Sequence, residues 1–341
     1  MCTRRSLGNF LDSSFNGMKN KKVLITGGLG FIGSNLAKKC LELGAEITIY
    51  DNSDPNSGGN LFNIELFRKD VELIVGDIID YEYLTRIIMG KDIVINCAAS
   101  TSHSYSMSAP WLNLDVNCRG VINVLEAIKQ FNRSVKLVHL GTTTQLGKLR
   151  YQPADELHPE FPTDMYSANK MVAEKYVLLY ANAYKLDAFV IRFPNVFGPR
   201  AAIHSPEFTF NNYFIGLALE NKSITVYEPG TQLRNVLYVD DAVDSLIAAL
   251  DTDKAKNEVF FAVGSEHYSV KNIAEQTCMV MGGLVEMVDW PKNRKAIAIG
   301  DAVISNKKIK DTIGWSPRVS FKDGLICTKN YYKSCLDKYR R

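Results

Sequence analysis

Val23-Leu-Ile-Thr-Gly-Gly-Leu-Gly-Phe-Ile-Gly33 is the stretch that decides the fold of this chain. Residues 23–26 form a short apolar run that predicts a buried strand, and a glycine-rich turn follows it directly. A helical pattern then runs over 31–43, and a second apolar strand is predicted at 46–50. Strand, glycine turn, helix and strand in this order are the setting in which such a turn binds a dinucleotide.

The glycine spacing itself indicates how the turn would bind phosphate. Gly27, Gly30 and Gly33 carry no side chains, so backbone amides can approach a pyrophosphate at the start of the helix. Phe31 and Ile32, in the first helical turn, are predicted to take part in cofactor binding. The alternative is a tight turn that holds no ligand.

Asp51 stands at the end of the second predicted strand, 18 residues after Gly33. A carboxylate there can accept hydrogen bonds from both ribose hydroxyls and would repel a 2′-phosphate, which favours NAD over NADP. Asn52 is predicted to contact the cofactor too. The alternative reading is an Asp51-Asn52 pair that only forms a turn.

Further short apolar runs alternate with helical patterns along the first two thirds of the chain. Strands are predicted at 73–75, 93–97, 135–140 and 188–192, and helices at 117–131 and 166–184. This alternation predicts an α/β protein in which a doubly wound parallel sheet forms a Rossmann domain, joined to a smaller mixed α/β substrate lobe.

Domain bounds follow from where this regularity changes. The predicted parts are a disordered polar leader at 1–17, a Rossmann domain at 18–193 to which 234–266 returns, a substrate lobe at 194–233 and 267–330, and a C-terminal helix end at 331–341. The leader has no apolar segment of the kind that marks a secretory signal.

Composition excludes several classes of function. The net charge is +3, from 40 basic and 37 acidic residues without a basic stripe, which opposes nucleic-acid binding. No apolar run reaches the roughly 18 residues that span a bilayer. The seven cysteines show no Cys-x-x-Cys pair, so no metal site is predicted, and free thiols suit the cytoplasm.

Tyr166-Ser-Ala-Asn-Lys170 carries the predicted chemistry. A phenol and an ammonium four residues apart lie on one helix face. The cation of Lys170 should favour the phenolate of Tyr166, so that the tyrosine acts as a base well below its ordinary pKa. Such a pair beside a dinucleotide can move a proton and a hydride together.

Other cofactor contacts are predicted at the ends of the strands. Asp77, followed by Ile78, could bond the adenine amino group, although a loop-capping aspartate is the alternative. Ala98 and Ala99 would let the backbone pack against the cofactor.

Several separated motifs occur together in one order. They are the glycine turn, Gly76-Asp-Ile78, Asn117-Cys-Arg-Gly120, Gly141-Thr142 to Gly147, Tyr166-x-x-x-Lys170, Arg192-Phe-Pro-Asn-Val-Phe-Gly-Pro199 and Arg234-Asn-Val-Leu-Tyr-Val-Asp240. With them the chain resembles the extended short-chain dehydrogenase/reductase family, in its NAD-dependent nucleotide-sugar epimerase/dehydratase branch, over about 21–325.

The resemblance implies a role for each matching residue. Tyr166 would be the general base and acid, Lys170 would bind the nicotinamide ribose and lower the pKa of the tyrosine, and Thr142 would be the third catalytic hydroxyl. The other implied contacts are Asn117 and Phe193 with the cofactor, and Thr143, Asn195 and Arg234 with the nucleotide-sugar substrate. A homodimer is implied as well.

Thr142-Thr143-Thr144 narrows the reaction. Dehydratases of the branch resemble Thr-Asp-Glu at this place and use both carboxyl groups for elimination, which three threonines cannot do. The prediction is therefore an enzyme similar to UDP-glucose 4-epimerase, acting at C4 in polysaccharide biosynthesis. A 2-epimerase, a C4 dehydrogenase and a keto-reductase stay open, as does an inactive NAD-binding scaffold or redox sensor.

Overall fold

The computed structural model describes residues 17–340, apart from 55 and 292–298. The predicted leader therefore lies outside the described residues, except for its last residue, Gly17, which is exposed. Met18 directly after it is buried in the hydrophobic core.

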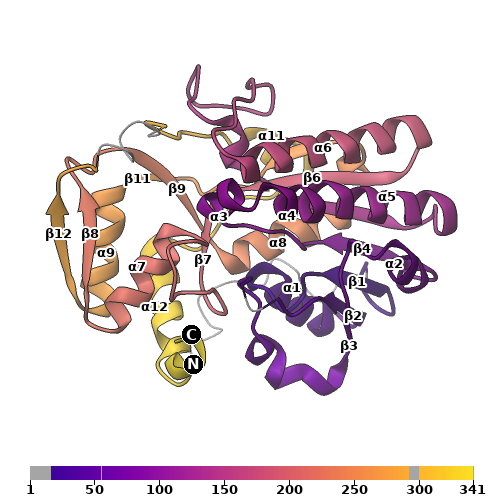
Figure 1. Cartoon of the computed structure of the whole chain (residues 1–341), viewed down its shortest axis with the longest axis horizontal. Coiled ribbons are helices and arrows are strands. Elements are labelled where there is room, and N and C mark those ends of the chain that lie inside the picture. Colours follow the sequence, from indigo (N-terminus) through magenta and orange to yellow (C-terminus); the bar gives the residue numbers. More distant parts are fainter. Residues whose placement is uncertain (1–16, 55, 292–298, 341) are drawn as a thin grey trace.

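A seven-stranded, all-parallel sheet forms the centre of the larger lobe, as predicted (Figure 1). Its order is β10-β6-β5-β4-β1-β2-β3. The strands are β1 (Lys22–Thr26), β2 (Glu46–Asp51), β3 (Val71–Val75), β4 (Ile93–Asn96), β5 (Lys136–Thr142), β6 (Asp187–Phe193) and β10 (Val259–Phe261). The strand order reverses between β1 and β4, and ligands of such sheets bind beyond the carboxyl ends at that point.

Both faces of the sheet are covered by helices, which explains why its strands are mostly apolar. On β1, Val23 and Ile25 face α1 (Phe31–Glu42) and α8 (Val239–Leu250), whereas Leu24 faces the opposite layer. That layer contains α2 (Tyr81–Ile88), α5 (Gly120–Phe131) and α6 (Met165–Tyr184). Alternate residues of each strand thus enter two separate cores.

The smaller lobe lies beside the carboxyl ends of the sheet (Figure 1). Its strands form one sheet of β7 (Asn195–Phe197), β9 (Leu233–Tyr238) and β11 (His267–Ser269), and another of β8 (Ser223–Tyr227) and β12 (Leu284–Val288). Its helices are α7 (Phe210–Leu219), α9 (Val270–Met281), α11 (Lys307–Ile313) and α12 (Phe321–Tyr332). One continuous core joins these elements to α1, α8 and the large sheet.

The segment 234–266 contributes to both sheets. β10 pairs with β6 of the large sheet, whereas β9 pairs with β7 and β11 of the small one. The return of the chain to the Rossmann sheet thus takes place at β10, and the predicted domain bounds stay a prediction.

Short helical elements complete the chain. They are the 3-10 helices η1 (Leu61–Asp70), η3 (Thr143–Leu146), η4 (Asp253–Ala255) and η5 (Leu336–Tyr339), the π-helix η2 (Asp115–Arg119), and the helices α3 (His103–Ser108) and α4 (Pro110–Leu114). The helix predicted at 117–131 therefore begins inside a π-helical turn. The predicted C-terminal helix breaks after Tyr332, where a 3-10 turn follows. Within the described residues, we find no helix with the length and apolar character to cross a membrane.

Candidate active site

The glycine turn leaves an open cradle at the start of α1. A Cβ atom on Gly33 would lie 2.4 Å from the carbonyl oxygen of Gly27, and one on Gly27 would lie 2.8 Å from the backbone of Ala98. Gly30 caps α1 without a side-chain hydrogen bond, and the first helical turn contains no acidic residue. Free amides, a helix dipole and close backbone contact together fit the pyrophosphate of a dinucleotide.

Asp51 lies beside this cradle, as predicted. Its Oδ2 accepts the backbone N–H of Leu29 at 3.0 Å, and its Oδ1 accepts that of Ser53 at 2.9 Å. Burial raises the pKa of the carboxyl, while the two amide bonds oppose that shift. Each oxygen keeps a second lone pair, so the group still fits a ribose diol.

Asp77 and Asn52 form a pair at the edge of the sheet. Asn52 Nδ2 donates to Asp77 Oδ2 at 2.9 Å, and Asp77 Oδ1 accepts the backbone N–H of Ile79 at 3.1 Å. The loop-capping role of Asp77 is therefore present, and its contact with adenine stays a prediction. Ile78 is buried and packs on Gly120, where a Cβ atom would lie 2.3 Å from its side chain.

The loop after β4 is held by Asn117. Asn117 Nδ2 donates to the carbonyl of Ser100 at 2.9 Å, and its Oδ1 accepts the Ser100 backbone N–H at 3.2 Å. Both ends of this buried amide are therefore used on the backbone that follows Ala98 and Ala99. Asn117 thus fixes this loop in place, and its contact with the cofactor stays a prediction.

Lys170 ends a buried polar chain that the sequence pattern did not indicate. Its Nζ donates to the carbonyl of Leu140 at 2.5 Å and lies 3.2 Å from Nε2 of His139. His139 in turn contacts Asn96, which bonds Thr26 at the end of β1. Burial lowers the pKa of Lys170 to about 8, although Cys97, Glu174 and Cys118 oppose the shift.

The role of Lys170 in lowering the pKa of Tyr166 stays a prediction. Burial raises the pKa of the half-buried Tyr166 to about 12, and the negative charge of Asp164 adds to the rise, whereas Thr142 opposes it. The ammonium of Lys170 points to β5, because the strand offers it a carbonyl and a neutral imidazole.

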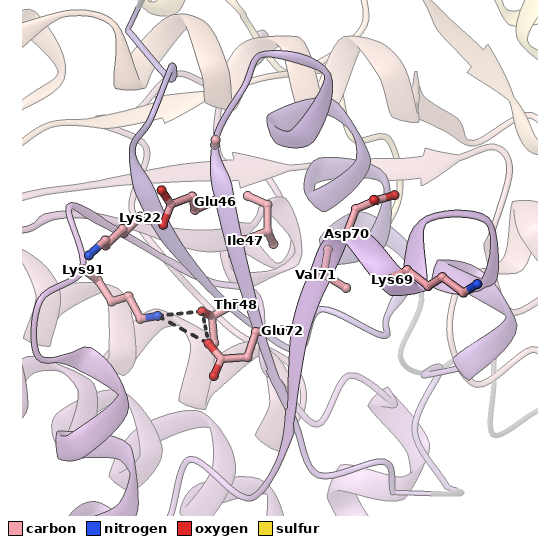
Figure 2. Close-up of a pocket in the computed structure, with 10 residues that line it drawn as sticks. Lys22, Glu46, Ile47, Thr48, Lys69, Asp70, Val71, Glu72 and Lys91 are labelled. Atoms are coloured by element: carbon pink, nitrogen blue, oxygen red, sulfur yellow. Dashed lines mark hydrogen bonds and ion pairs between the residues drawn. The ribbon is translucent and has the colours of Figure 1, made fainter.

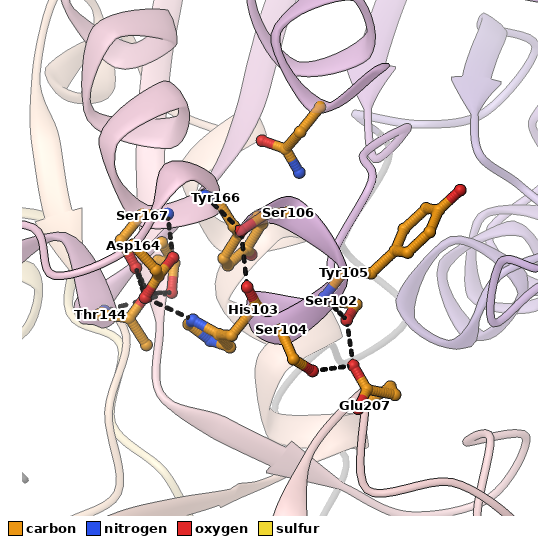
Figure 3. A network of polar contacts seen from close by, with 12 residues as sticks. Ser102, His103, Ser104, Tyr105, Ser106, Thr144, Asp164, Tyr166, Ser167 and Glu207 are labelled. Carbon is orange, nitrogen blue, oxygen red and sulfur yellow. Dashed lines mark hydrogen bonds and ion pairs between the residues drawn. The ribbon is translucent and has the colours of Figure 1, made fainter. Parts of the chain in front are cut away.

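Polar side chains continue from Thr144 to Ser167 and Asp164 at the start of α6 (Figure 3). Thr142 Oγ1 lies 3.1 Å from Thr144 Oγ1, which accepts from Ser167 Oγ at 3.0 Å. Ser167 also reaches Asp164, the N-cap of α6, and Asp164 Oδ2 lies 2.8 Å from His103 Nδ1. His103 begins α3, and its ring packs edge-on against that of Tyr166.

The residues predicted to bind substrate lie on β5, η3, β7 and β9. Thr143 follows Thr142 directly, and Phe193, which was predicted to contact the cofactor, pairs with Thr142 across the sheet. Asn195 Nδ2 donates to the carbonyl of Asn235 at 3.2 Å. Arg234 Nη1 donates to the carbonyls of Leu233 at 2.7 Å and Gly300 at 2.6 Å, so two carbonyls hold its guanidinium in place.

A separate cavity of about 650 Å³ opens at the amino ends of β1, β2 and β3 (Figure 2). Its lining includes the first residues of β1, β2 and β3, together with Lys91, which bonds Thr48 at 2.6 Å. Basic and acidic side chains alternate there without a net sign. In the described part of the chain, no group of three or more His, Cys, Asp or Glu residues is arranged to hold a metal ion.

Comparison with known proteins relates this arrangement to one family. Residues 23–264 match the family described as the NAD dependent epimerase/dehydratase family. CDP-paratose 2-epimerase of Salmonella typhi is 26% identical over 333 residues, which cover 89% of this chain and 97% of the relative. UDP-glucuronic acid decarboxylase 1 of Xenopus tropicalis is 29% identical over 330 residues, which cover 93% of this chain and 73% of the relative.

A solved structure extends the likeness to three dimensions. UDP-glucose 4-epimerase of Thermotoga maritima, solved with UDP-glucose, superposes with a TM-score of 0.82 at 25% identity. The match covers 92% of this chain and 99% of that one. The proteins that this chain resembles therefore include two kinds of epimerase and a decarboxylase.

Proposed function

Because the chain belongs to the NAD dependent epimerase/dehydratase family and uses NAD, we propose that it epimerises a nucleotide-diphosphate sugar at C4. The observation that supports this reaction is that Thr142 ends β5 while Tyr166 and Lys170 lie on α6, which packs on that strand, with threonines at 143 and 144. An epimerase needs one group that takes and returns a proton, and no acid for elimination.

The glycine turn and Asp51 would hold NAD, which would supply an acceptor for the hydride and later return it. Tyr166 takes the proton of the C4 hydroxyl, and Thr142 adds a second hydroxyl that can bond the sugar oxygen. Lys170, which spends two N–H groups on Leu140 and His139, has a third for a ribose hydroxyl. The 4-keto sugar then turns about its diphosphate, and Tyr166 returns the proton on the other face.

Among the described residues of this site, no acidic side chain is available to donate the proton that elimination of water requires. Thr143 and Thr144 stand where a dehydratase would need two carboxyl groups. Asp164 is near, but both its oxygens are engaged by Ser167 and His103. Burial alone would raise the pKa of Asp164, yet the His103 and Ser167 bonds outweigh burial and lower it, so the group stays charged.

The nucleotide end of the substrate would lie against the smaller lobe. Arg234 presents a guanidinium whose other N–H groups suit a diphosphate, and Asn195 adds an amide. Such substrates serve polysaccharide biosynthesis, and we expect the enzyme to work in the cytoplasm.

We expect a homodimer formed through α4 and α6. Trp111 of α4 is 78% exposed, and Met107, Leu114 and Leu179 are exposed beside the same layer of helices. Exposed apolar side chains that gather in this way mark interaction surfaces.

The proposal is tested by incubating the purified protein with UDP-, GDP-, CDP- and dTDP-sugars and following the products by NMR. Inversion at C4 of one sugar supports it. Inversion at C2 would instead identify a 2-epimerase. A keto product with NADH released would identify a dehydrogenase, and no conversion at all would favour a binding scaffold.

Tyr166→Phe separates chemistry from binding. The variant should lose at least about a hundredfold in turnover, the contribution of a positioned proton-transfer group, while it still binds NAD. Tyr176→Phe, on the same helix and outside the site, is the matched control. Turnover that survives in Tyr166→Phe removes this residue as the base.

A further inference from the structure

We propose that Tyr339 of η5 is a positioning residue for NAD, because it holds the glycine turn in its binding conformation through Asn63. A neighbouring contact between η5 and Asn60 supports the same turn. The inference rests on NAD as the cofactor and not on the sugar carbon at which the enzyme acts.

Leu29 lies in the middle of the glycine turn, and both polar groups of its backbone are engaged. Its N–H donates to Asp51 Oδ2 at 3.0 Å. Its carbonyl accepts the backbone N–H of Asn60 at 3.1 Å and Nδ2 of Asn63 at 2.9 Å. The carboxylate that would hold the ribose and the turn that would hold the pyrophosphate are therefore joined through one buried residue, so a displacement of Leu29 disturbs both.

Asn63 has every polar group of its side chain engaged. Nδ2 donates to the carbonyl of Leu29 at 2.9 Å and to that of Arg200 at 3.3 Å. Because these two carbonyls require the amide nitrogen on their side, Oδ1 faces Tyr339 and accepts its phenol proton at 2.6 Å. The side chain is buried, so loss of the phenol hydroxyl would leave Oδ1 without a partner in the interior.

The surroundings of Tyr339 hold its hydroxyl in one place. The buried ring packs edge-on against Phe62 and Tyr332, with centroids 5.9 and 5.0 Å away. Tyr331 Oη lies 2.6 Å from the phenol oxygen. Burial raises the pKa of Tyr339, so the phenol keeps the proton that it donates to Asn63. Tyr339 is thus a fixed donor and not a side chain that adapts to its partner.

Asn60 forms a second contact between η5 and the turn. Its Nδ2 donates to the carbonyl of Lys338 at 2.9 Å, and its Oδ1 accepts the backbone N–H of Phe62 at 3.0 Å as the N-cap of η1. Its own backbone N–H bonds the carbonyl of Leu29. Two successive residues of η5 therefore reach the same carbonyl of the turn, each through one asparagine.

The consequence for NAD is preorganisation of the turn. Backbone amides that face the pyrophosphate must be in place before the dinucleotide binds. A turn that also populates other conformations binds with an affinity reduced by the fraction in the binding conformation. Loss of one buried hydrogen bond changes such an equilibrium on the order of tenfold, which sets the expected size of the effect.

Calorimetric titration of the full-length protein with NAD tests the role of Tyr339. Tyr339→Phe keeps the packed ring and removes the hydroxyl, and we expect the affinity for NAD to fall about tenfold. Tyr332→Phe is the matched control, because its buried phenol bonds the carbonyl of Ala201 at 2.7 Å instead of Asn63. Both variants should lose similar stability in urea unfolding without NAD, whereas only Tyr339→Phe should lose affinity.

A double-mutant cycle tests the route through Asn63. Asn63→Ala should weaken NAD binding by itself, and adding Tyr339→Phe to it should have no further effect, because the phenol then has no amide to hold. Wild-type affinity in Tyr339→Phe, or an equal loss of affinity in Tyr332→Phe, overturns the proposal. So does a tenfold effect of Tyr339→Phe that persists in the Asn63→Ala background. These outcomes leave the proposed epimerisation untouched, because the NMR assay of the sugars decides it separately.

Discussion

Lys170→Met is expected to stabilise the folded protein at neutral pH, although it removes a residue of the site. The ammonium is buried, and its pKa falls from 10.5 in the reference state to about 8 in the fold. A shift of this size corresponds to about 3 kcal/mol of destabilisation where both states carry the proton. Against this, methionine leaves the Leu140 carbonyl and His139 without their partner, at about 2 kcal/mol.

The sign of the pH dependence follows from which state binds more protons. Between the folded pKa near 8 and the unfolded value of 10.5, the unfolded chain holds the Lys170 proton while the folded protein releases it. The stability of the wild type therefore rises with pH through this window, relative to a variant without the lysine. At pH 7 the full penalty of burial is present.

Urea unfolding of wild type and Lys170→Met at pH 7 and pH 10 measures this difference. The variant should be more stable by about 1 kcal/mol at pH 7 and less stable by about 1 kcal/mol at pH 10. Lys175→Met, on the same helix but half-exposed, is the control and should cost at most about 1 kcal/mol at pH 7. A Lys170→Met variant that is much less stable at pH 7, or a gap that does not change with pH, refutes the reasoning.

Three further outcomes are expected. Glu174→Gln removes a carboxylate that pairs with the buried guanidinium of Arg192. The free energy of unfolding, measured with urea at pH 7, should fall by about 3 kcal/mol. Burial raises the pKa of Glu174, but Arg192 outweighs burial and lowers it, so this contribution should vanish from the wild type as the pH falls through the lowered value. Gly33→Ala places a Cβ atom 2.4 Å from the Gly27 carbonyl oxygen. It should weaken NAD binding at least about tenfold in calorimetry and cost about 1–3 kcal/mol of stability. A variant that binds NAD with wild-type affinity would contradict the assignment of the glycine turn as the pyrophosphate site. Trp111→Lys should shift sedimentation toward the monomer, and an unchanged profile would exclude α4 from the interface.

The positions of the strands along the chain were predictable, because the residue pattern that marks each strand is local. Runs such as 23–26 and 46–50 are rich in isoleucine, leucine, valine and threonine, and that pattern is typical of strands covered on both faces. The turn at Gly27 was also predictable from local sequence. Three glycines at fixed spacing allow the backbone conformation of this turn, and all three lie within one short segment.

The partners of the site residues were less predictable. The spacing of Tyr166 and Lys170 correctly placed both on α6, but it did not indicate that Nζ of Lys170 bonds β5. The contact of His103 with Asp164 was not predictable, because the two residues are 61 positions apart along the chain. No spacing pattern in the sequence links an N-cap aspartate to a histidine so far away.

The sequence by itself determined the alternating strands and helices, the dinucleotide turn and the tyrosine–lysine pair, because each depends on the periodicity of residues close together in the chain. Only the tertiary structure decided what those groups contact and how readily they give up a proton. Burial and hydrogen bonds set that property, and both come from strands and helices that meet only when the sheet has formed.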